Sequence, residues 1–327
     1  MKFKMNVVVS VLLMVAAGCA SAPRDVVKVG SYNIRLSGVN GSADRGTPNA
    51  WKERKEDLLE LVRKLDLDVF GLQEVCPDQA KFLRDNLAGY EFVGEHRNAD
   101  RKTGEASPVC YRKSRFEALG KGTFWLSETP DVPGLKGWGA ACPRVCSYLI
   151  LRDRATGRKF CFANAHTDHV SALAREKGML LVIERMKEFG AGVPIVFTGD
   201  HNCREDEAPA KAVAGILKDA LYLSENPQRG SWRTFSGWKW KDSEMPIVEA
   251  LKVPVEMRNA KKGSPDGIKI ASGVHPYEQY GARIDYIYVS PGVRVLDFET
   301  VNDPRPGKKL YPSDHFPVVA TIEFPQD

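Results

Sequence analysis

The chain has 327 residues, with 47 lysines and arginines against 42 aspartates and glutamates, and a formal net charge of +5. This mild positive charge is compatible with a phosphate-bearing substrate, but it excludes the dense cationic surface of a dedicated nucleic-acid-binding protein. No low-complexity linker or fixed-period repeat divides the chain, so one compact domain is favoured over two small ones.

The N-terminal residues have the pattern of an export signal. Two lysines in the first four residues precede an apolar run over 7–17, which is too short to span a membrane comfortably. The sequence Ala-Ala-Gly then leads directly into Cys19, which resembles a bacterial lipoprotein cleavage site. We therefore expect a lipid anchor at Cys19 and a location in the bacterial cell envelope, attached to a membrane. An ordinary cleaved signal peptide or a transmembrane anchor is the alternative.

Periodicity after this signal predicts alternating strands and helices. Over 26–35, Val27 and Val29 fall on one face of a strand and Tyr32 and Ile34 on the other. Leucines and a valine form one stripe of a helix over 51–65. Further strands are predicted over 68–73, 90–95, 106–113, 116–126, 145–153, 158–165, 194–199, 284–290, 293–301 and 316–324, with further helices over 78–87, 171–188 and 208–217.

The mixture of hairpins and strand–helix alternations predicts an α+β protein with mixed, mainly antiparallel sheets. One segment, 228–282, is unusually long for a connection in a compact domain, which favours a functional role. It carries Trp232, Phe235, Trp238 and Trp240. These aromatic rings either stack on a substrate or pack the loop against the body, and Trp238 is our candidate for substrate binding.

Six short polar motifs each end or interrupt an apolar run. They are, in chain order, S-Y-N-I-R with Asn33, G-L-Q-E-V with Glu74, N-A-H-T-D-H at 164–169, G-D-H-N at 199–202, R-I-D-Y with Asp285, and S-D-H at 313–315. Carboxylates, amides and histidines at strand ends converge on one cleft when the strands belong to a central sheet. The set therefore predicts a metal-using hydrolytic active site.

The order of these motifs and the residues in them resemble the endonuclease/exonuclease/phosphatase superfamily, over nearly the whole chain after about residue 25. The resemblance implies a four-layer α/β sandwich, in which two sheets pack face to face with helices outside. One residue departs from the family pattern: His201 stands where an apolar residue such as Phe is usual. The chain then divides into a signal peptide over 1–18, a tether over 19–25 and a catalytic domain over 26–327, with 228–282 as a specificity loop.

Glu74 is the best candidate for a metal ligand, because a carboxylate leaves a buried strand there. By resemblance, Asn33 and Asp314 complete or support this site. Hard oxygen donors favour Mg²⁺, with Mn²⁺ or Ca²⁺ as substitutes. A zinc site that includes Asp200 is the alternative, but the chain has neither a C-x-x-C pair nor an H-E-x-x-H motif.

Asp285 lies on an otherwise apolar strand face and should therefore be paired, and His315 is the partner we expect. By resemblance, Asp200 orients or deprotonates the attacking water and Asn202 donates to a phosphate oxygen.

The resemblance also implies that His166 pairs with an upstream glutamate, for which Glu105 has the right place. Asn164 is expected beside His166 as a brace and a substrate contact.

The leading hypothesis is a Mg²⁺-dependent phosphoester hydrolase of the cell envelope, either a phosphodiesterase or a phosphatase, with no obligate protein partner. A secreted nuclease is the main alternative, and nucleic acid, nucleotide, lipid and sugar phosphate all stay open as substrates. A non-catalytic binding protein on the same scaffold is less consistent with the complete set of motif residues.

Overall fold

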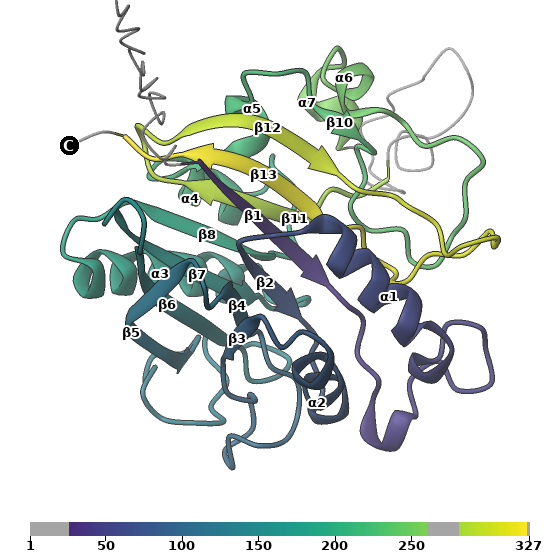
Figure 1. Ribbon diagram of the computed structural model, residues 1–327, viewed down its shortest axis with the longest axis horizontal. Coiled ribbons are helices and arrows are strands. Elements are labelled where there is room, and N and C mark those ends of the chain that lie inside the picture. Colours follow the sequence, from purple (N-terminus) through teal and green to yellow (C-terminus); the bar gives the residue numbers. More distant parts are fainter. Residues whose placement is uncertain (1–25, 260–280, 326–327) are drawn as a thin grey trace, which may run out of the picture.

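A computed structural model describes residues 26–259 and 281–325 (Figure 1). The predicted signal peptide, the tether, the proposed anchor at Cys19 and part of the 228–282 loop lie outside the described residues. Two β-sheets form the centre of the fold.

The seven-stranded sheet has mixed pairing. In spatial order it contains β10 (Arg229–Gly230), β12 (Arg294–Thr300), β13 (Val318–Glu323), β1 (Val26–Asn33), β2 (Val69–Gln73), β4 (Val109–Arg112) and β3 (Tyr90–Val93). The six-stranded sheet contains β5 (Phe116–Trp125), β6 (Val145–Asp153), β7 (Lys159–His166), β8 (Ile195–Asp200), β11 (Asp285–Val289) and β9 (Lys218–Asp219). Most neighbours within both sheets are antiparallel, as predicted.

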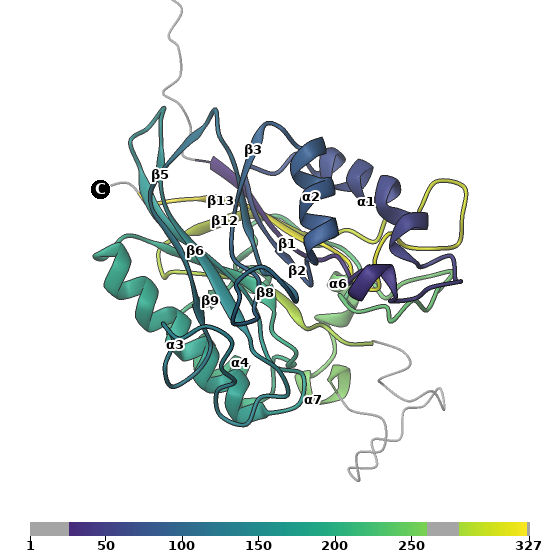
Figure 2. The same cartoon turned by 90° about the horizontal axis from the view of Figure 1, so that it is seen from below.

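Helices cover the outer faces of the two sheets (Figure 2). On the first sheet lie α1 (Trp51–Leu65) and α2 (Pro77–Asn86); on the second lie α3 (Ala172–Gly190) and α4 (Ala208–Ala214). Short elements complete the described chain: the 3₁₀ turn η1 (Val39–Gly41) and the helices α5 (Ala220–Leu223), α6 (Ile247–Ala250) and α7 (Val255–Arg258). The predicted four-layer sandwich is confirmed.

Three apolar cores separate these layers. Strand β1 illustrates the arrangement, because Val27 and Val29 lie in the core between the sheets, whereas Tyr32 and Ile34 lie in the core beneath α1 and α2. Each strand of a two-sided sheet buries both of its faces. The predicted division of β1 into two faces is therefore confirmed.

Strand pairing brings the polar motifs to one end of the sandwich. Strands β1 and β2 are parallel with Asn33 opposite Gln73, so Glu74 follows immediately beside Asn33. Strands β7 and β8 are also parallel, with His166 opposite Asp200, and β11 places Asp285 opposite Asp200 from the other side. These two sets of strands therefore present their motif residues to one another across the two sheets.

Local structure differs from the prediction in two places. The strand predicted over 106–113 begins only at Val109, since Pro108 has no N–H to donate to a ladder and Ala106 makes isolated bridges instead. The 218–258 region contains five short elements that were not predicted, because elements of two to four residues have too few positions for a periodic pattern.

Neither disulfides nor spanning helices occur in the described part of the chain. Its six cysteines are free thiols, of which five are buried and Cys142 is half-buried. Among the same residues, no helix has both the length and the apolar character needed to cross a membrane.

His201 is buried in the core beneath α3 and α4. Its ring stacks on Tyr286 and Tyr288 at centroid distances of 5.7 and 5.6 Å, and it packs against Phe197. Neither ring nitrogen has a hydrogen-bond partner among the described residues. Burial lowers the His201 pKa from its ordinary 6.5 to about 3, so the ring is neutral in the folded protein. His201 thus acts as an aromatic core residue.

We expect His201→Phe to make stability less dependent on pH. Below pH 6.5 the unfolded chain protonates this histidine while the folded chain does not, so the wild-type protein loses stability as the pH falls from 6.5 towards 3. The difference in unfolding free energy between variant and wild type should grow by roughly 2 kcal/mol from pH 7 to pH 5. Urea titrations at both pH values measure it, and the change with pH is independent of any constant steric cost of phenylalanine. Parallel pH dependences for the two proteins would contradict the assignment.

Candidate active site

Asp200 stands at the centre of the converging motifs. Its Oδ2 accepts a hydrogen bond from the Asn33 side-chain amide at 2.9 Å. The same oxygen lies 3.4 Å from His166 Nε2 and 3.7 Å from His315 Nε2. The structure therefore brings together four motifs, of which those of Asn33, His166 and His315 are separated from one another by more than a hundred residues in the chain.

Gly199 explains why a glycine precedes Asp200. A Cβ atom at position 199 would lie 2.0 Å from the carbonyl oxygen of Ala165 on β7. Only a residue without a side chain lets β8 approach β7 this closely and carry Asp200 to the level of His166. The glycine of the G-D-H-N motif is thus required by packing.

Glu74 and Asp314 supply the oxygen donors for a cation. Glu74 Oε1 accepts from the Asn33 amide at 3.0 Å, and its Oε2 accepts from the Leu36 backbone N–H at 2.8 Å. Glu74 adopts a left-handed backbone (φ 62°), an uncommon conformation that is concentrated at functional positions. Asp314 is buried, and burial together with the nearby Glu74 charge raises its pKa, although His315 opposes the shift.

This donor set fits a hard divalent cation. Glu74 and Asp314 are close enough for the Glu74 charge to act on Asp314, and the partly exposed Arg35 guanidinium lies 3.9 Å from Asp314. The Asn33 Oδ1 accepts from the Arg35 backbone N–H at 3.0 Å and keeps a second lone pair. Mutual repulsion between buried carboxylates is relieved when a cation binds between them. Glu74 and Asp314 thus have the chemistry of metal ligands, and their role, like that of Asn33, stays a prediction.

His315 is paired with Asp285, as the sequence predicts. The His315 Nδ1 lies 2.9 Å from Asp285 Oδ2, and both residues are buried. Burial by itself would lower the His315 pKa, but the negative charges of Asp285 and Asp200 outweigh it and raise the pKa to about 10. The imidazole is therefore cationic at neutral pH, and its Nε2 faces the centre of the site.

His166 has the opposite protonation state. Burial, followed by the nearby charge of Arg144, lowers its pKa well below 6.5. The Asn202 amide donates to His166 Nε2 at 2.9 Å and to the Thr167 carbonyl at 3.1 Å. Both N–H groups of Asn202 are thus occupied, so this side chain holds His166 in place and does not offer the phosphate donor that we expected.

Glu105 lies beside His166 but makes its closest contact elsewhere. Its Oε2 is 3.9 Å from His166 Nδ1, longer than a hydrogen bond, whereas its Oε1 is 2.8 Å from the Arg97 guanidinium. Burial raises the Glu105 pKa, with Arg97 opposing the shift. Glu105 therefore approaches the neutral His166 ring at 3.9 Å without the direct hydrogen bond of the expected pair.

The Asp200 carboxylate has the properties of a base. Burial and the adjacent Asp285 raise its pKa from 3.8 to about 7, in spite of the cationic His315. A carboxylate whose pKa lies near neutral pH accepts a proton far more readily than an ordinary aspartate. The expected role of Asp200 in deprotonating water therefore has a physical basis.

Asn164 does not reach the open site. It is fully buried, and its amide donates to the carbonyls of Leu72 and Pro108 at 2.8 and 3.0 Å. Its Oδ1 accepts from Gln73 at 2.6 Å, and the space it fills is left open by Gly71. The prediction that Asn164 contacts substrate is corrected: the residue joins the two sheets beneath the site.

The aromatic loop supports the S-D-H segment. Backbone N–H groups of Ser236 and Gly237 donate to the Asp314 carbonyl, and the Phe235 ring lies 4.9 Å from the His315 ring. Trp232, in contrast, is fully buried and packs the loop against the body. The loop therefore packs against the body and against the S-D-H segment, whereas stacking of its aromatic rings on a substrate stays a prediction.

Trp238 and Arg54 form a contact that sequence reasoning missed. Arg54 is buried, and its guanidinium lies 5.1 Å from the Trp51 ring and 5.5 Å from the Trp238 ring. It donates to the carbonyls of Ile34 and Pro312, which directly follow Asn33 and directly precede Ser313. Arg54 therefore ties together the two chain segments that carry metal ligands. Trp238 lies beside this arginine, next to the site.

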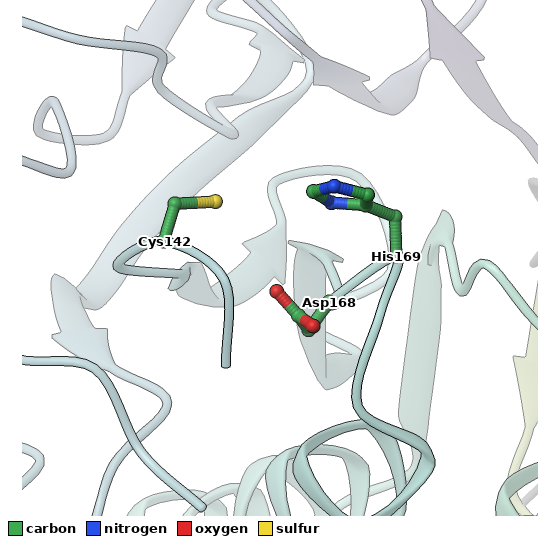
Figure 3. A group of neighbouring side chains, drawn as sticks. All are labelled: Cys142, Asp168 and His169. Atoms are coloured by element: carbon green, nitrogen blue, oxygen red, sulfur yellow. The ribbon is translucent and has the colours of Figure 1, made fainter. Parts of the chain in front are cut away.

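A second cluster of donor atoms lies beyond His166 (Figure 3). Atoms of Cys142, Asp168 and His169 lie within 4.8 Å of one another, with Cys142 on a loop and the other two after β7. Arg144 has no acceptor, so it donates to His169 Nδ1 at 2.9 Å. The Asp168 oxygens accept three backbone N–H groups. These contacts occupy His169 Nδ1 and three acceptor positions of Asp168, so the cluster braces the His166 loop.

Known proteins resemble this chain in sequence and in fold. Residues 30–315 match the family described as the endonuclease/exonuclease/phosphatase family. The chain belongs to this family. The resemblance inferred from the motifs is confirmed.

Solved structures and curated relatives agree with this assignment. An endonuclease/exonuclease/phosphatase family protein from Bacteroides thetaiotaomicron is 32% identical, with a TM-score of 0.74, over 92% of this chain and 98% of that one. A mannosyl-6-phosphatase from the same organism is also 32% identical, with a TM-score of 0.72, over 91% and 100%. Nocturnin of Drosophila melanogaster is 26% identical over 302 residues, covering 84% of this chain but 42% of its own length. The chain thus spans less than half of that relative.

Proposed function

We propose that the protein is a divalent-metal-dependent hydrolase of small-molecule phosphate esters. The observation that carries the proposal is the Asn33 amide, which bridges the metal-site carboxylate Glu74 and the base Asp200 at 3.0 and 2.9 Å. A cation site and a base are thereby held on either side of one side chain. His315 adds a positive charge within the same cleft.

The chain's own residues account for the proton and charge movements of hydrolysis. Asp200 takes a proton from water as the water oxygen bonds to phosphorus, and the phosphorus–oxygen bond to the alcohol breaks. The departing alkoxide takes up the proton that Asp200 accepted and leaves as the alcohol, so that Asp200 is again deprotonated. Cationic His315 stabilises the negative charge on the phosphoryl oxygens. A bound Mg²⁺, held by Glu74, Asp314 and Asn33, would polarise the phosphoryl group and stabilise the leaving oxygen.

Charge pairing around the cleft favours a small substrate over nucleic acid. Arg97 pairs with Glu105 at 2.8 Å and Arg35 pairs with Asp44 at 3.1 Å. A nucleic-acid track needs cations that are free to neutralise successive phosphates. The 32% identical mannosyl-6-phosphatase, whose name gives a sugar phosphate, supports the same conclusion.

An activity panel tests the proposal. Purified protein with Mg²⁺ would be assayed on hexose phosphates, nucleotides, lipid phosphodiesters, DNA and RNA, with EDTA controls. We expect metal-dependent release of inorganic phosphate from small monoesters. Turnover of DNA or RNA alone would favour the alternative of a nuclease, and the absence of turnover on all substrates would favour a binding protein.

We expect Glu74→Ala to abolish most Mg²⁺-dependent turnover while the fold is retained. The substitution removes one hard oxygen ligand from a pre-formed site, so Mg²⁺ affinity should fall by at least about tenfold. Calorimetric titration with Mg²⁺ measures the affinity directly, and Glu60→Ala, on the exposed face of α1, is the matched control. Unchanged metal affinity together with wild-type turnover would exclude Glu74 as a ligand.

We also propose that the protein is held at a bacterial membrane through Cys19, on the basis of the signal sequence alone. In the parent cell, Cys19→Ser should leave the protein unprocessed or soluble. Detergent-phase partitioning measures this, and identical partitioning of variant and wild type would remove the proposed anchor.

A further inference from the structure

A groove of about 850 Å³ adjoins the metal site. Leu36 and Glu105 line its inner end, and the Leu36 backbone N–H holds Glu74. One wall comes from η1 and the start of α1, including Val39 and Trp51. The volume is in the range of small-molecule binding sites. No catalytic step described above uses this groove.

Asp200 and the groove lie at the two ends of a chain of hydrogen bonds through Asn33 and Glu74. The Asn33 amide contacts Asp200 through one bond and Glu74 through the other, and Glu74 in turn contacts Leu36 at the groove. In-line displacement places the attacking water and the departing oxygen on opposite sides of phosphorus. If Asp200 activates the water, the departing alcohol points past Glu74 towards the groove.

The lining of the groove has the mixed chemistry that a hydroxyl-rich ligand requires. Acidic Asp78 and Glu105 and basic Arg45, Lys52 and Arg97 line it together with apolar side chains and glycine backbone. Sugar hydroxyls both donate and accept hydrogen bonds, and the faces of sugar rings are apolar. A groove for a nucleic-acid backbone would instead show unpaired cations only.

We propose that this groove binds the alcohol portion of the substrate, and that this portion is a neutral, sugar-sized polyol. The inference rests on the proposed phosphoester hydrolysis and names its substrate class. It makes Val39 and Lys52, neither of which has a role in the proposed hydrolysis, determinants of specificity. Val39 is 81% exposed at the wall, so its side chain is free to be enlarged without disturbing the core.

Groove-filling and groove-charge variants test the proposal. Val39→Trp and Lys52→Glu would be compared with Leu119→Trp, a matched control at an exposed position on β5. The measurements are KM for a hexose 6-phosphate, and the inhibition constant of inorganic phosphate, which reports on the catalytic site alone. We expect Val39→Trp to raise KM at least tenfold with an unchanged phosphate inhibition constant, and the control to change neither value.

The outcomes separate this inference from the proposed function. An unchanged KM, or equal rises in KM and in the phosphate inhibition constant, would overturn the groove assignment while hydrolysis itself stands. Turnover of oligonucleotides but not of hexose phosphates would also overturn it. If the wild-type protein hydrolyses no phosphoester, the proposed function fails. Calorimetric titration of wild type and Val39→Trp with hexose 6-phosphate then still tests whether the groove binds the sugar. Binding lost in the variant supports it, whereas absence of binding to the wild type overturns it.

Discussion

Asp200→Asn should reduce kcat by roughly 10³-fold with little change in the fold. Asparagine keeps the shape of the side chain but cannot take a proton from water, and general-base catalysis contributes about 10²–10⁴-fold. The Asn33 amide would then face either an amide oxygen or an amide nitrogen, so the network also loses its central charge. Steady-state kinetics on a small phosphate ester measure the loss.

The pH profile gives Asp200 a second, independent signature. Only the deprotonated carboxylate is a base, so activity should rise with pH through the Asp200 pKa, which burial and Asp285 move from 3.8 to about 7. In Asp200→Asn this acid limb should disappear. Asp85→Asn, which changes an exposed aspartate on α2, is the control. An Asp200→Asn enzyme with a wild-type rate and the same acid limb would show that another group activates the water.

His315→Ala should lower kcat by about 10²-fold or more, equivalent to roughly 2.7 kcal/mol of transition-state stabilisation. The alanine removes a cation that faces the phosphate, whereas the other substrate contacts persist, so turnover should suffer more than KM. Substrates with a good and a poor leaving group would be compared. A larger loss on the poor leaving group would indicate that His315 also acts as a proton donor.

Asp285→Asn tests the charge of His315 while the histidine side chain itself is kept. The amide retains the size of Asp285 and a hydrogen bond to Nδ1, but it removes the largest influence that raises the His315 pKa towards 10. If protonated His315 is the active form, the basic limb of the pH profile should move towards acid. Wild-type rates and an unshifted profile in both variants would leave this pair with no catalytic role.

The sequence by itself determined which side chains are available at the site. The motifs identified Asn33, Glu74, Asp200 and His315, because polar residues at the ends of apolar runs are recognisable from the sequence pattern. Periodicity identified α1 with its bounds as observed, since Leu58, Leu61, Val62 and Leu65 on one stripe give a strong signal. The Asp285–His315 pair was also predicted, because a carboxylate on a buried strand face needs a partner.

Only the tertiary structure decided what each polar residue does. Asn164 lies in a motif beside His166, yet the packing of the two sheets turns its amide towards Leu72 and Pro108 and away from the cleft. Arg54 ties two chain segments together through the carbonyls of Ile34 and of Pro312, which is 258 residues away. No sequence pattern distinguishes a buried arginine on a helix from an exposed one. Pairings of this kind arise from sheet register and layer packing, which a local pattern does not contain. The groove beside Glu74 is a further example, since three separate segments must meet before it exists.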